Sequence, residues 1–384
     1  MGSKLNYDDI TIVPEVVTDI ESRKQCWPFD ENGFLPIFAS CMSSVINDEN
    51  YKAFNNSKIK VVIPRNLPLT RRIVLAKLYS TPYCFVAFSL NEVIEMFLHN
   101  HSDEIGIEWK FSYICIDLAN GHMKKLLDTV KAIKQKCPQI TIMTGNIANP
   151  KTYKLYDEAG VDYVRLSIGS GACCTTASNT GVHYPVFSLL KETYEIKKSI
   201  DGKCKIIADG GIKDYRDIQK ALIYADDVMI GSLFNKAIES AGKTTYGASY
   251  FIIKGHKILR PIKTLFQYGR QVYGSKYRTE KKFNKLIDDI KKGKIVLWKE
   301  CYGMSTKLAQ QEINCASGST CNNTTKLKTA EGLVKRQKVE FSIKGWVENE
   351  IDYLRSAMSY TNSRTLKEYK ESQYVRITEI RYNR

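Results

Sequence analysis

The sequence predicts an α/β fold, a (β/α)8 TIM barrel with a long basic insertion after its eighth strand. Short apolar runs recur at even spacing from Leu35 to Leu233, and stretches of helical periodicity separate them. Glycine and polar residues follow several runs directly, at the positions where the loops of such a barrel carry the active site. A chain of 384 residues can bury the core of one large barrel or of two ordinary domains.

Eight apolar runs are the candidate strands. Several are β-branched and apolar on both faces, as expected of parallel strands that are covered on both sides. A doubly wound sheet is the alternative, but eight evenly spaced runs favour closure into a barrel. The expected strands are Leu35–Ser40, Lys60–Pro64, Tyr83–Leu90, Tyr113–Ala119, Thr141–Ile147, Tyr163–Gly169, Lys205–Gly211 and Asp227–Leu233. Helices are expected between them, for instance at Met123–Lys136 and Asp214–Ile223.

Four strand ends carry candidate site residues. Asp117–His122 follows the fourth strand, Gly145-Asn146 the fifth, Asp209–Gly211 the seventh and Gly231-Ser232 the eighth. Glycines at the last two ends let backbone N–H groups approach a phosphate, and the serine adds a hydroxyl donor. The aspartate before the glycine pair is suited to accept hydrogen bonds from ribose hydroxyls. A glycine pair alone is more often a tight turn, so the signal lies in the combination of these ends.

A cysteine pair lies on a glycine-rich segment after the sixth expected strand. Gly169 to Pro185 reads GSGACCTTASNTGVHYP, so Cys173 and Cys174 have small, polar neighbours. A lone cysteine is usually a small buried hydrophobe, but these flanks do not suit burial. A thiolate on a flexible loop can approach a flat substrate, and the segment is therefore a candidate nucleophile loop.

The composition is that of a soluble globular protein, with 43% hydrophobic and 26% charged residues. No run is apolar enough to span a membrane and no secretory pattern opens the chain, so a cytoplasmic protein without a membrane partner is expected. The 11 cysteines are scattered and suggest neither a disulfide framework nor a zinc site. The five histidines are equally dispersed and suggest no metal triad.

The net charge of +16 is concentrated in one segment. Between Lys243 and Glu300 there are 15 Lys and Arg residues against 4 Asp and Glu, which leaves about +5 for the rest of the chain. The segment also carries Tyr246, Tyr250, Tyr268, Tyr273 and Tyr277, a mixture that single-stranded nucleic-acid binders use for stacking. A solvated basic insertion over residues 244–297 is the favoured interpretation, so nucleic acid is an open but less favoured partner.

The cysteine loop resembles the catalytic loop of the IMP dehydrogenase/GMP reductase family. That loop reads Gly-x-Gly-Ser-x-Cys-x-Thr, which aligns with Gly169, Gly171, Ala172, Cys174 and Thr176. Thr180 to Pro185 is similar to the GMP reductase version in particular. Further segments extend the resemblance over nearly the whole chain: Leu5–Pro14, Ser22-Arg23, Pro36–Met42, Ile116–Gly121, Tyr302–Ser305, Ala330–Gly332, Lys344–Val347 and Leu354–Ser356.

The resemblance implies chemistry at C2 of a purine nucleotide, which a cysteine thiolate attacks. In a dehydrogenase IMP then gives hydride to NAD and the adduct is hydrolysed. In a reductase GMP loses ammonia and NADPH delivers hydride, which yields IMP.

The sequence favours the reductase branch. Dehydrogenases activate the hydrolytic water with an Arg-Tyr pair in the flap, and between Ser305 and Glu331 this chain has neither residue. It also lacks room for the regulatory domains that dehydrogenases usually insert after the second strand. GMP reductase-like activity is therefore expected. IMP dehydrogenase activity, or a non-catalytic nucleotide- or nucleic-acid-binding relative, is the alternative.

Motif positions imply a role for each site residue. Cys174 is the nucleophile, because the Cys-x-Thr spacing selects it over Cys173, and Thr176 with Glu331 relays protons. Substrate contacts are expected from Met42, Asn146, Asp209, Gly210, Gly211, Gly231, Ser232, Tyr302, Gly303, Met304, Ser305, Lys328 and Gly332. NADPH contacts are expected from Asp117, Leu118 and Ala119 and, across a subunit boundary of a homotetramer, from Ser22, Arg23, Ser356 and Ser359. Carbonyls of Gly169, Gly171 and Cys174 are expected to hold a potassium ion. The resemblance implies one barrel domain over residues 1–384, with the basic insertion 244–297 within it and a mobile flap at 306–340.

Several positions depart from the family pattern. Met42-Ser43-Ser44 replaces the family's Met-Asp-Thr, so a carboxylate is missing from the floor of the site. Ala172 removes a hydroxyl from the phosphate loop, while Ser170 and Ala177 replace a proline and an arginine. Lys328 replaces a flap arginine, which keeps the charge and loses the bidentate fork. These changes leave open whether a deoxynucleotide or modified purine is preferred, and whether NADPH or NADH is used.

Overall fold

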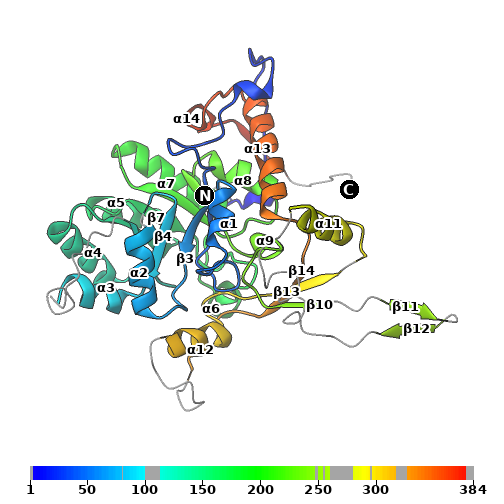
Figure 1. Cartoon of the computed structure of the whole chain (residues 1–384). Helices are drawn as coiled ribbons and strands as arrows, with labels where there is room; N and C mark the ends of the chain where they lie inside the picture. Colours follow the sequence, from blue (N-terminus) through cyan, green and yellow to red (C-terminus); the bar gives the residue numbers. More distant parts are fainter. Residues whose placement is uncertain are drawn as a thin grey trace.

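A closed barrel of eight parallel strands forms the centre of the protein (Figure 1), which confirms the predicted (β/α)8 architecture. The structure is a computed structural model that describes residues 3–79, 81–99, 113–246, 250–253, 256–259, 280–294, 296–316 and 327–377. Every expected strand contains an observed one. The barrel strands are β2 (Ile37–Ala39), β3 (Lys60–Ile63), β4 (Cys84–Phe88), β5 (Tyr113–Asp117), β6 (Thr141–Ile147), β7 (Tyr163–Leu166), β8 (Lys205–Asp209) and β9 (Asp227–Ile230).

Each barrel strand pairs in parallel with the next, and β2 pairs with β9 to close the barrel, with Ile37 opposite Val228 and Ala39 opposite Ile230. Helices follow the strands, and the two predicted helices are present within their expected ranges. The helices of the barrel are α1 (Tyr51–Asn56), α2 (Leu69–Tyr79), α3 (Leu90–Phe97), α4 (Lys124–Lys136), α5 (Thr152–Glu158), α6 (Thr176–Thr180), α7 (Val186–Ser199), α8 (Tyr215–Leu222) and α9 (Ser232–Asn235).

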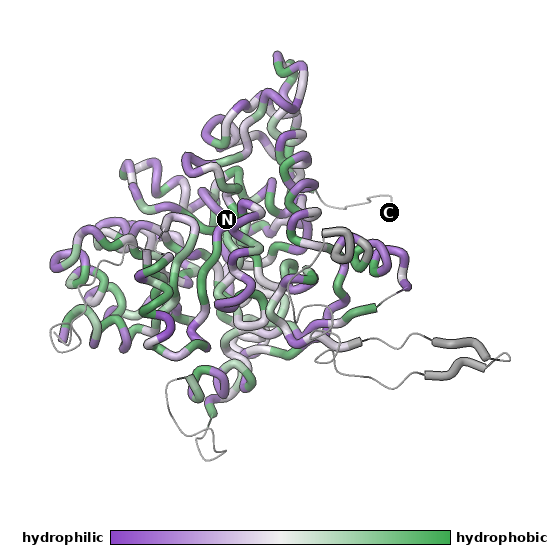
Figure 2. The backbone as a smooth tube through the Cα atoms, in the orientation of Figure 1, coloured by the Kyte–Doolittle hydropathy of each residue, from purple (hydrophilic) through white to green (hydrophobic). Residues whose placement is uncertain are grey.

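The strands are apolar on both faces because each face has its own core. Inside the barrel Phe38, Phe85, Met143, Tyr163 and Met229 pack together, so the barrel is filled rather than open. The other face packs against the surrounding helices in a second, larger core. Figure 2 shows the same division, with hydrophobic segments concentrated in the barrel and hydrophilic ones at the periphery.

Further elements surround the barrel. A three-stranded antiparallel sheet joins β10 (Thr244–Tyr246), β13 (Leu297–Cys301) and β14 (Lys335–Lys338). β11 (Tyr250–Ile253) and β12 (His256–Leu259) pair with each other, and α11 (Glu280–Lys291) precedes β13. The remaining elements are the short helices Tyr7–Asp9 and Arg23–Gln25, β1 (Ile10–Ile12), α12 (Lys307–Ala316), α13 (Ile343–Tyr360), α14 (Leu366–Tyr369) and β15 (Tyr374–Arg376).

Parts of two predicted segments lie outside the described residues. In the basic insertion these are residues 247–249, 254–255, 260–279 and 295, with Tyr268, Tyr273 and Tyr277 among them, and in the flap they are residues 317–326. The division of the chain into one domain with these two segments stays a prediction. Among the described helices, none combines the length and apolar character of a transmembrane segment.

A buried carboxyl on α13 makes stability depend on pH. Glu350 is fully buried, its Oε1 accepts a hydrogen bond from Gln219 Nε2 at 3.4 Å, and its Oε2 has no partner. Burial holds the pKa of Glu350 well above its usual range. A raised folded-state pKa contributes stability below the unfolded-state pKa, and that stability is lost as the pH rises.

Glu350→Gln should therefore stabilise the protein at neutral pH, because an amide needs no proton uptake on folding; the gain is about 1.4 kcal/mol for each pH unit above the unfolded-state pKa, up to the folded-state pKa. The gain should vanish at acidic pH, where wild-type Glu350 is protonated in both the folded and unfolded states. Thermal unfolding at both pH values measures it. Glu348→Gln, on the exposed face of the same helix, is the matched control and should change neither. A gain that is the same at both pH values would contradict this account.

Candidate active site

A cavity of about 340 Å³ opens at the carboxyl ends of the barrel strands. Its walls come from the loops after β2, β7, β8, β9 and β13, so segments far apart in the sequence meet there. The predicted substrate residues on its wall are Met42, Asp209, Gly210, Gly211, Gly231, Ser232, Gly303 and Ser305. Residues of the cysteine loop from Ser170 to Cys174 complete this side of the cavity.

Backbone conformation requires glycine at the end of β8, and close packing favours it at the end of β9. Gly210 has φ +125° and Gly211 has φ +78°, a region that L side chains rarely adopt. At Gly231 a Cβ would come within 2.5 Å of the Met42 sulfur. These glycines bring the backbone directly to the cavity wall, as a phosphate-binding loop requires.

Three predicted catalytic side chains form one hydrogen-bonded chain. The Cys174 thiol donates to Thr176 Oγ1 at 3.3 Å, and the Thr176 hydroxyl donates to Glu331 Oε2 at 2.6 Å. Cys174 and Thr176 come from the loop after β7, whereas Glu331 lies 155 residues further on. A proton can therefore pass between the thiol and the carboxylate through one hydroxyl.

Backbone pairing holds the Glu331 segment against the cysteine loop. Thr175 N–H donates to the Glu331 carbonyl at 2.9 Å, and Leu333 N–H donates to the Cys173 carbonyl at 2.8 Å. Cys174 and Gly332 form an isolated antiparallel bridge between these bonds. This short two-stranded ladder therefore holds the Glu331 side chain next to Thr176.

The two adjacent cysteines have different surroundings. Cys173 is buried, with its sulfur 3.5 Å from the sulfur of Cys301 at the end of β13. Cys174 is only half-buried and hydrogen-bonds Thr176. The burial of Cys173 differs from the expectation that the flanks of this pair do not suit burial, because the loop packs against the end of β13; Cys174 is the more accessible thiol.

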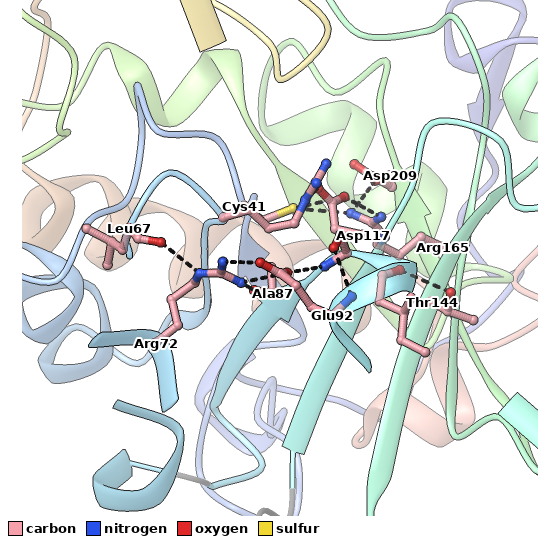
Figure 3. Close-up of polar contacts among 12 residues, drawn as sticks. Cys41, Leu67, Arg72, Ala87, Glu92, Asp117, Thr144, Arg165 and Asp209 are labelled. Atoms are coloured by element: carbon pink, nitrogen blue, oxygen red, sulfur yellow. Dashed lines mark hydrogen bonds and ion pairs between the residues drawn. The ribbon is translucent and has the colours of Figure 1, made fainter. Parts of the chain in front are cut away.

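A charged cluster lies below the cavity, inside the barrel (Figure 3). Arg165 Nη2 donates to Asp117 Oδ1 at 2.7 Å, and Arg65 Nε donates to Asp117 Oδ2 at 3.1 Å. Burial alone would raise the pKa of Asp117, but these two guanidinium groups hold it well below its usual range. Asp117 is therefore a carboxylate with both oxygens occupied.

Asp209 has a weaker set of partners than Asp117. Its Oδ2 accepts from Asn146 Nδ2 at 2.8 Å and lies 3.8 Å from Arg165 Nη1. Burial raises the pKa of Asp209, and Arg165 and Asn146 offset this only in part. Since Asp209 also lines the cavity, its carboxyl group is available to a polar ligand.

Sequence reasoning missed both arginines of this cluster. Arg165 is 2% exposed in the middle of β7, a strand otherwise read as apolar, and Arg65 follows β3. A cation within an apolar strand was the available signal, because a buried charge needs a partner. Lys213, Lys236 and Gln337 on the cavity wall were missed as well.

The remaining predicted substrate residues do not line the cavity in the part of the chain described. Asn146 Nδ2 donates a hydrogen bond to the lining residue Asp209. Tyr302 is buried and its hydroxyl donates to Glu312, and Lys328 is exposed. Met304 lies between the lining residues Gly303 and Ser305, and a Cβ at Gly332 would come 3.0 Å from the carbonyl oxygen of the lining residue Cys173.

The predicted cofactor residues fall into two groups. Leu118 is half-buried and Ala119 exposed at the end of β5, so they can offer contact surface, whereas the Asp117 carboxylate is held by arginines. Ser22, Arg23, Ser356 and Ser359 lie where the N-terminal segment meets α13, and Arg23 Nη2 is 3.2 Å from Asp352 Oδ2. In Figure 1 α13 lies at the opposite end of the molecule from α6, the helix that follows the cysteine loop.

The expected potassium loop is a tightly turned backbone. Gly169 has φ +81°, and a Cβ there would meet Ala177 Cβ at 2.7 Å. The Gly171 carbonyl accepts from Cys174 N–H at 2.9 Å, which leaves its second lone pair free. Among the described side chains, no cluster of three or more His, Cys, Asp or Glu residues could hold a metal ion.

Comparison with known proteins agrees with this geometry. Residues 104–288 match the IMP dehydrogenase / GMP reductase domain. The GMP reductase of Caenorhabditis elegans is 26% identical over 387 aligned positions, which cover 98% of this chain and 92% of that protein. The GMP reductase of Staphylococcus saprophyticus is 28% identical over 249 positions, which cover 62% of this chain and 73% of that protein.

The inosine-5'-monophosphate dehydrogenase of Chlorobaculum tepidum is 42% identical over a shorter segment of 132 residues. That segment covers 34% of this chain and only 26% of the dehydrogenase. With a closed barrel and a cysteine loop at the carboxyl end of β7, the chain contains an IMP dehydrogenase/GMP reductase domain over residues 104–288. The enzymes named among these relatives are oxidoreductases of purine nucleotides.

Proposed function

We propose that this protein catalyses the reductive deamination of GMP, or of a related guanine nucleotide, to IMP and ammonia. The observation that carries this proposal is the hydrogen-bonded chain from Cys174 through Thr176 to Glu331. It joins a nucleophile to a proton donor, and both are needed to replace an amine at a purine carbon. The GMP reductase relative that aligns with 98% of this chain supports the same reaction.

The first step is attack of the Cys174 sulfur on C2 of the purine. The thiol proton leaves through the Thr176 hydroxyl to Glu331, so the C2–S bond forms as a proton moves onto the carboxylate. The same carboxyl group then returns a proton through Thr176 to the exocyclic amine. The C2–N bond breaks, ammonia leaves, and the purine stays attached to Cys174 as a thioimidate.

NADPH, when bound, supplies the hydride that reduces C2 and releases IMP. For this cofactor we propose Asp117, Leu118 and Ala119 on one side, with the Asp117 carboxylate acting through the arginines it holds. Ser22, Arg23, Ser356 and Ser359 would serve the site of a neighbouring subunit, because they lie away from the cavity of their own chain. A homotetramer provides such a neighbour, and sedimentation measures it: a fully active monomer would contradict this arrangement.

We also propose that the carbonyls of Gly169, Gly171 and Cys174 hold a potassium ion, which keeps the thiol loop in place. Backbone oxygens on a glycine-rich loop suit a weakly hydrated monovalent cation. Activity should fall when potassium is replaced by a large organic cation at equal ionic strength. Unchanged activity would exclude the site. All cysteines that the structure describes are free thiols, which suits the reducing cytoplasm.

Absorbance of the nicotinamide ring tests the proposed reaction. GMP, dGMP, IMP and XMP are each mixed with NADPH or NAD, and ammonia is assayed in parallel. We expect NADPH oxidation with a guanine nucleotide and one ammonia released per NADPH. Reduction of NAD by IMP alone would instead identify an IMP dehydrogenase, which the 42% identity to the Chlorobaculum enzyme keeps as the second candidate.

A further inference from the structure

A carboxylate from α12 lies between two loops that form the cavity. Glu312 Oε2 accepts a hydrogen bond from Ser43 Oγ at 2.6 Å, and its Oε1 accepts one from the Tyr302 hydroxyl at 2.6 Å. Both donors belong to residues that are only 6% exposed. Hydrogen bonds to an ionised acceptor are the strong ones, and here one carboxylate receives two.

The two loops that Glu312 joins are also bonded directly to each other. Ser44 Oγ donates to the Tyr302 carbonyl at 3.0 Å and lies 3.3 Å from Tyr302 N–H. Asn235 Nδ2 donates to the carbonyls of Ser44 at 2.8 Å and Glu300 at 3.0 Å. The loop after β2 and the loop after β13 are therefore held together by these hydrogen bonds, and Glu312 adds one bond to each loop.

In each loop, a residue adjacent to the one that bonds Glu312 lines the cavity. Met42 precedes Ser43, and Gly303 follows Tyr302, and both line the cavity wall. The helix that carries Glu312 begins two residues after Ser305, another lining residue. The Ser43–Glu312 bond thus lies directly behind two neighbouring parts of the wall.

The same helix also reaches the segment that carries Glu331. Gln310 Nε2 donates to the Ser305 carbonyl at 3.2 Å and to the Lys328 carbonyl at 3.3 Å. Glu331 N–H in turn donates to the Ser305 carbonyl at 3.3 Å. α12 therefore connects the loop after β2 with the backbone that positions the proton relay.

We propose that Glu312 is a positioning residue for the nucleotide, which supplies from α12 the carboxylate that position 43 lacks. The family motif that this chain resembles has an aspartate where Ser43 stands. Here the carboxylate comes from a residue 269 positions further along the chain, and a hydroxyl at position 43 binds it. This inference rests on the proposed function, because it takes the cavity as the nucleotide site.

The proposal predicts that a carboxylate is tolerated at position 43 or at position 312, but not at both. In Ser43→Asp the new carboxylate would face Glu312 at hydrogen-bond distance, and like charges repel. We expect the KM for GMP to rise by about tenfold or more, with kcat changing less. In the double variant S43D/E312Q, the amide can donate to the new aspartate while its oxygen accepts from Tyr302. That variant should recover to within about threefold of wild type.

Two single variants at position 312 complete this set of substitutions. Glu312→Gln alone leaves no carboxylate at either position and replaces two hydrogen bonds to a carboxylate with weaker ones to an amide, so the KM for GMP should rise by about three- to tenfold. Glu312→Ala removes both hydrogen bonds and should raise the KM by about tenfold. Gln311→Glu places a charge on the neighbouring exposed position of α12 and is the matched control, with no expected change.

Binding of IMP by calorimetry and thermal unfolding, measured on every variant, separate the possible results. A fold defect would lower the melting temperature of S43D without recovery of KM in S43D/E312Q, and would overturn the proposal. Additive effects of S43D and E312Q on IMP affinity would also overturn it. If wild-type protein binds IMP but does not reduce GMP, the proposed function fails, while recovery of IMP affinity in the double variant still supports the role of Glu312.

Discussion

Cys174→Ser is expected to abolish turnover while the protein still folds and binds nucleotide. A serine hydroxyl is a far weaker nucleophile than a thiolate at neutral pH, and removal of a nucleophile costs about 10⁴-fold or more in kcat. Serine fits the same space and can still donate to Thr176, so the cavity should be unchanged. NADPH oxidation with GMP measures turnover, and IMP calorimetry measures binding.

Cys173→Ala is the matched control for this variant. The Cys173 side chain is buried, with its sulfur 3.5 Å from both the carbonyl oxygen and the sulfur of Cys301, whereas Thr176 bonds Cys174 and Glu331. We expect turnover within about threefold of wild type and a modest loss of stability from the lost packing. Equal loss of turnover in both variants would undo the assignment of the nucleophile.

Glu331→Gln is expected to reduce deamination of GMP by about 10²-fold or more, the range typical of general acid–base groups. An amide at this position can accept the Thr176 hydrogen bond but cannot give a proton to the departing amine. Binding of GMP should be nearly intact, because the segment is also held by backbone bonds from Thr175 and Leu333. Pre-steady-state release of ammonia measures the step directly.

Hydride exchange between IMP and oxidised nicotinamide separates a relay from a lid. No amine moves in that half-reaction, so Glu331→Gln should impair it much less than deamination. A solvated carboxylate would affect neither half-reaction. If Glu331→Gln slowed both by the same factor, Glu331 would only close the site, and the relay through Thr176 would be wrong.

The barrel could be predicted from the sequence because its signal is local. Each strand is an apolar run that carries its own periodicity, and the eight observed strands lie within the eight expected ranges. The glycines beside the cavity were equally visible, since Gly210, Gly211 and Gly231 stand directly after strands. Motif spacing also selected Cys174 and Thr176.

The contacts between distant segments could not be predicted in the same way. The Arg165–Asp117 pair crosses from β7 to β5, and the Ser43–Glu312 bond joins residues 269 positions apart. Such pairs depend on how the loops meet in space, and no local pattern marks the partner. The family resemblance therefore indicated that a carboxylate is absent at position 43, but the sequence could not show that the carboxylate of Glu312 lies against Ser43.

The covalent link between Cys174 and the purine is the central claim, and mass spectrometry of the quenched enzyme tests it most directly. Wild-type protein is mixed with GMP without nicotinamide cofactor, quenched in acid and digested. The account predicts a peptide with Cys174 that has gained the mass of GMP less ammonia, also in Cys173→Ala and absent in Cys174→Ser. No adduct in wild type, or an adduct that persists in Cys174→Ser, would contradict it.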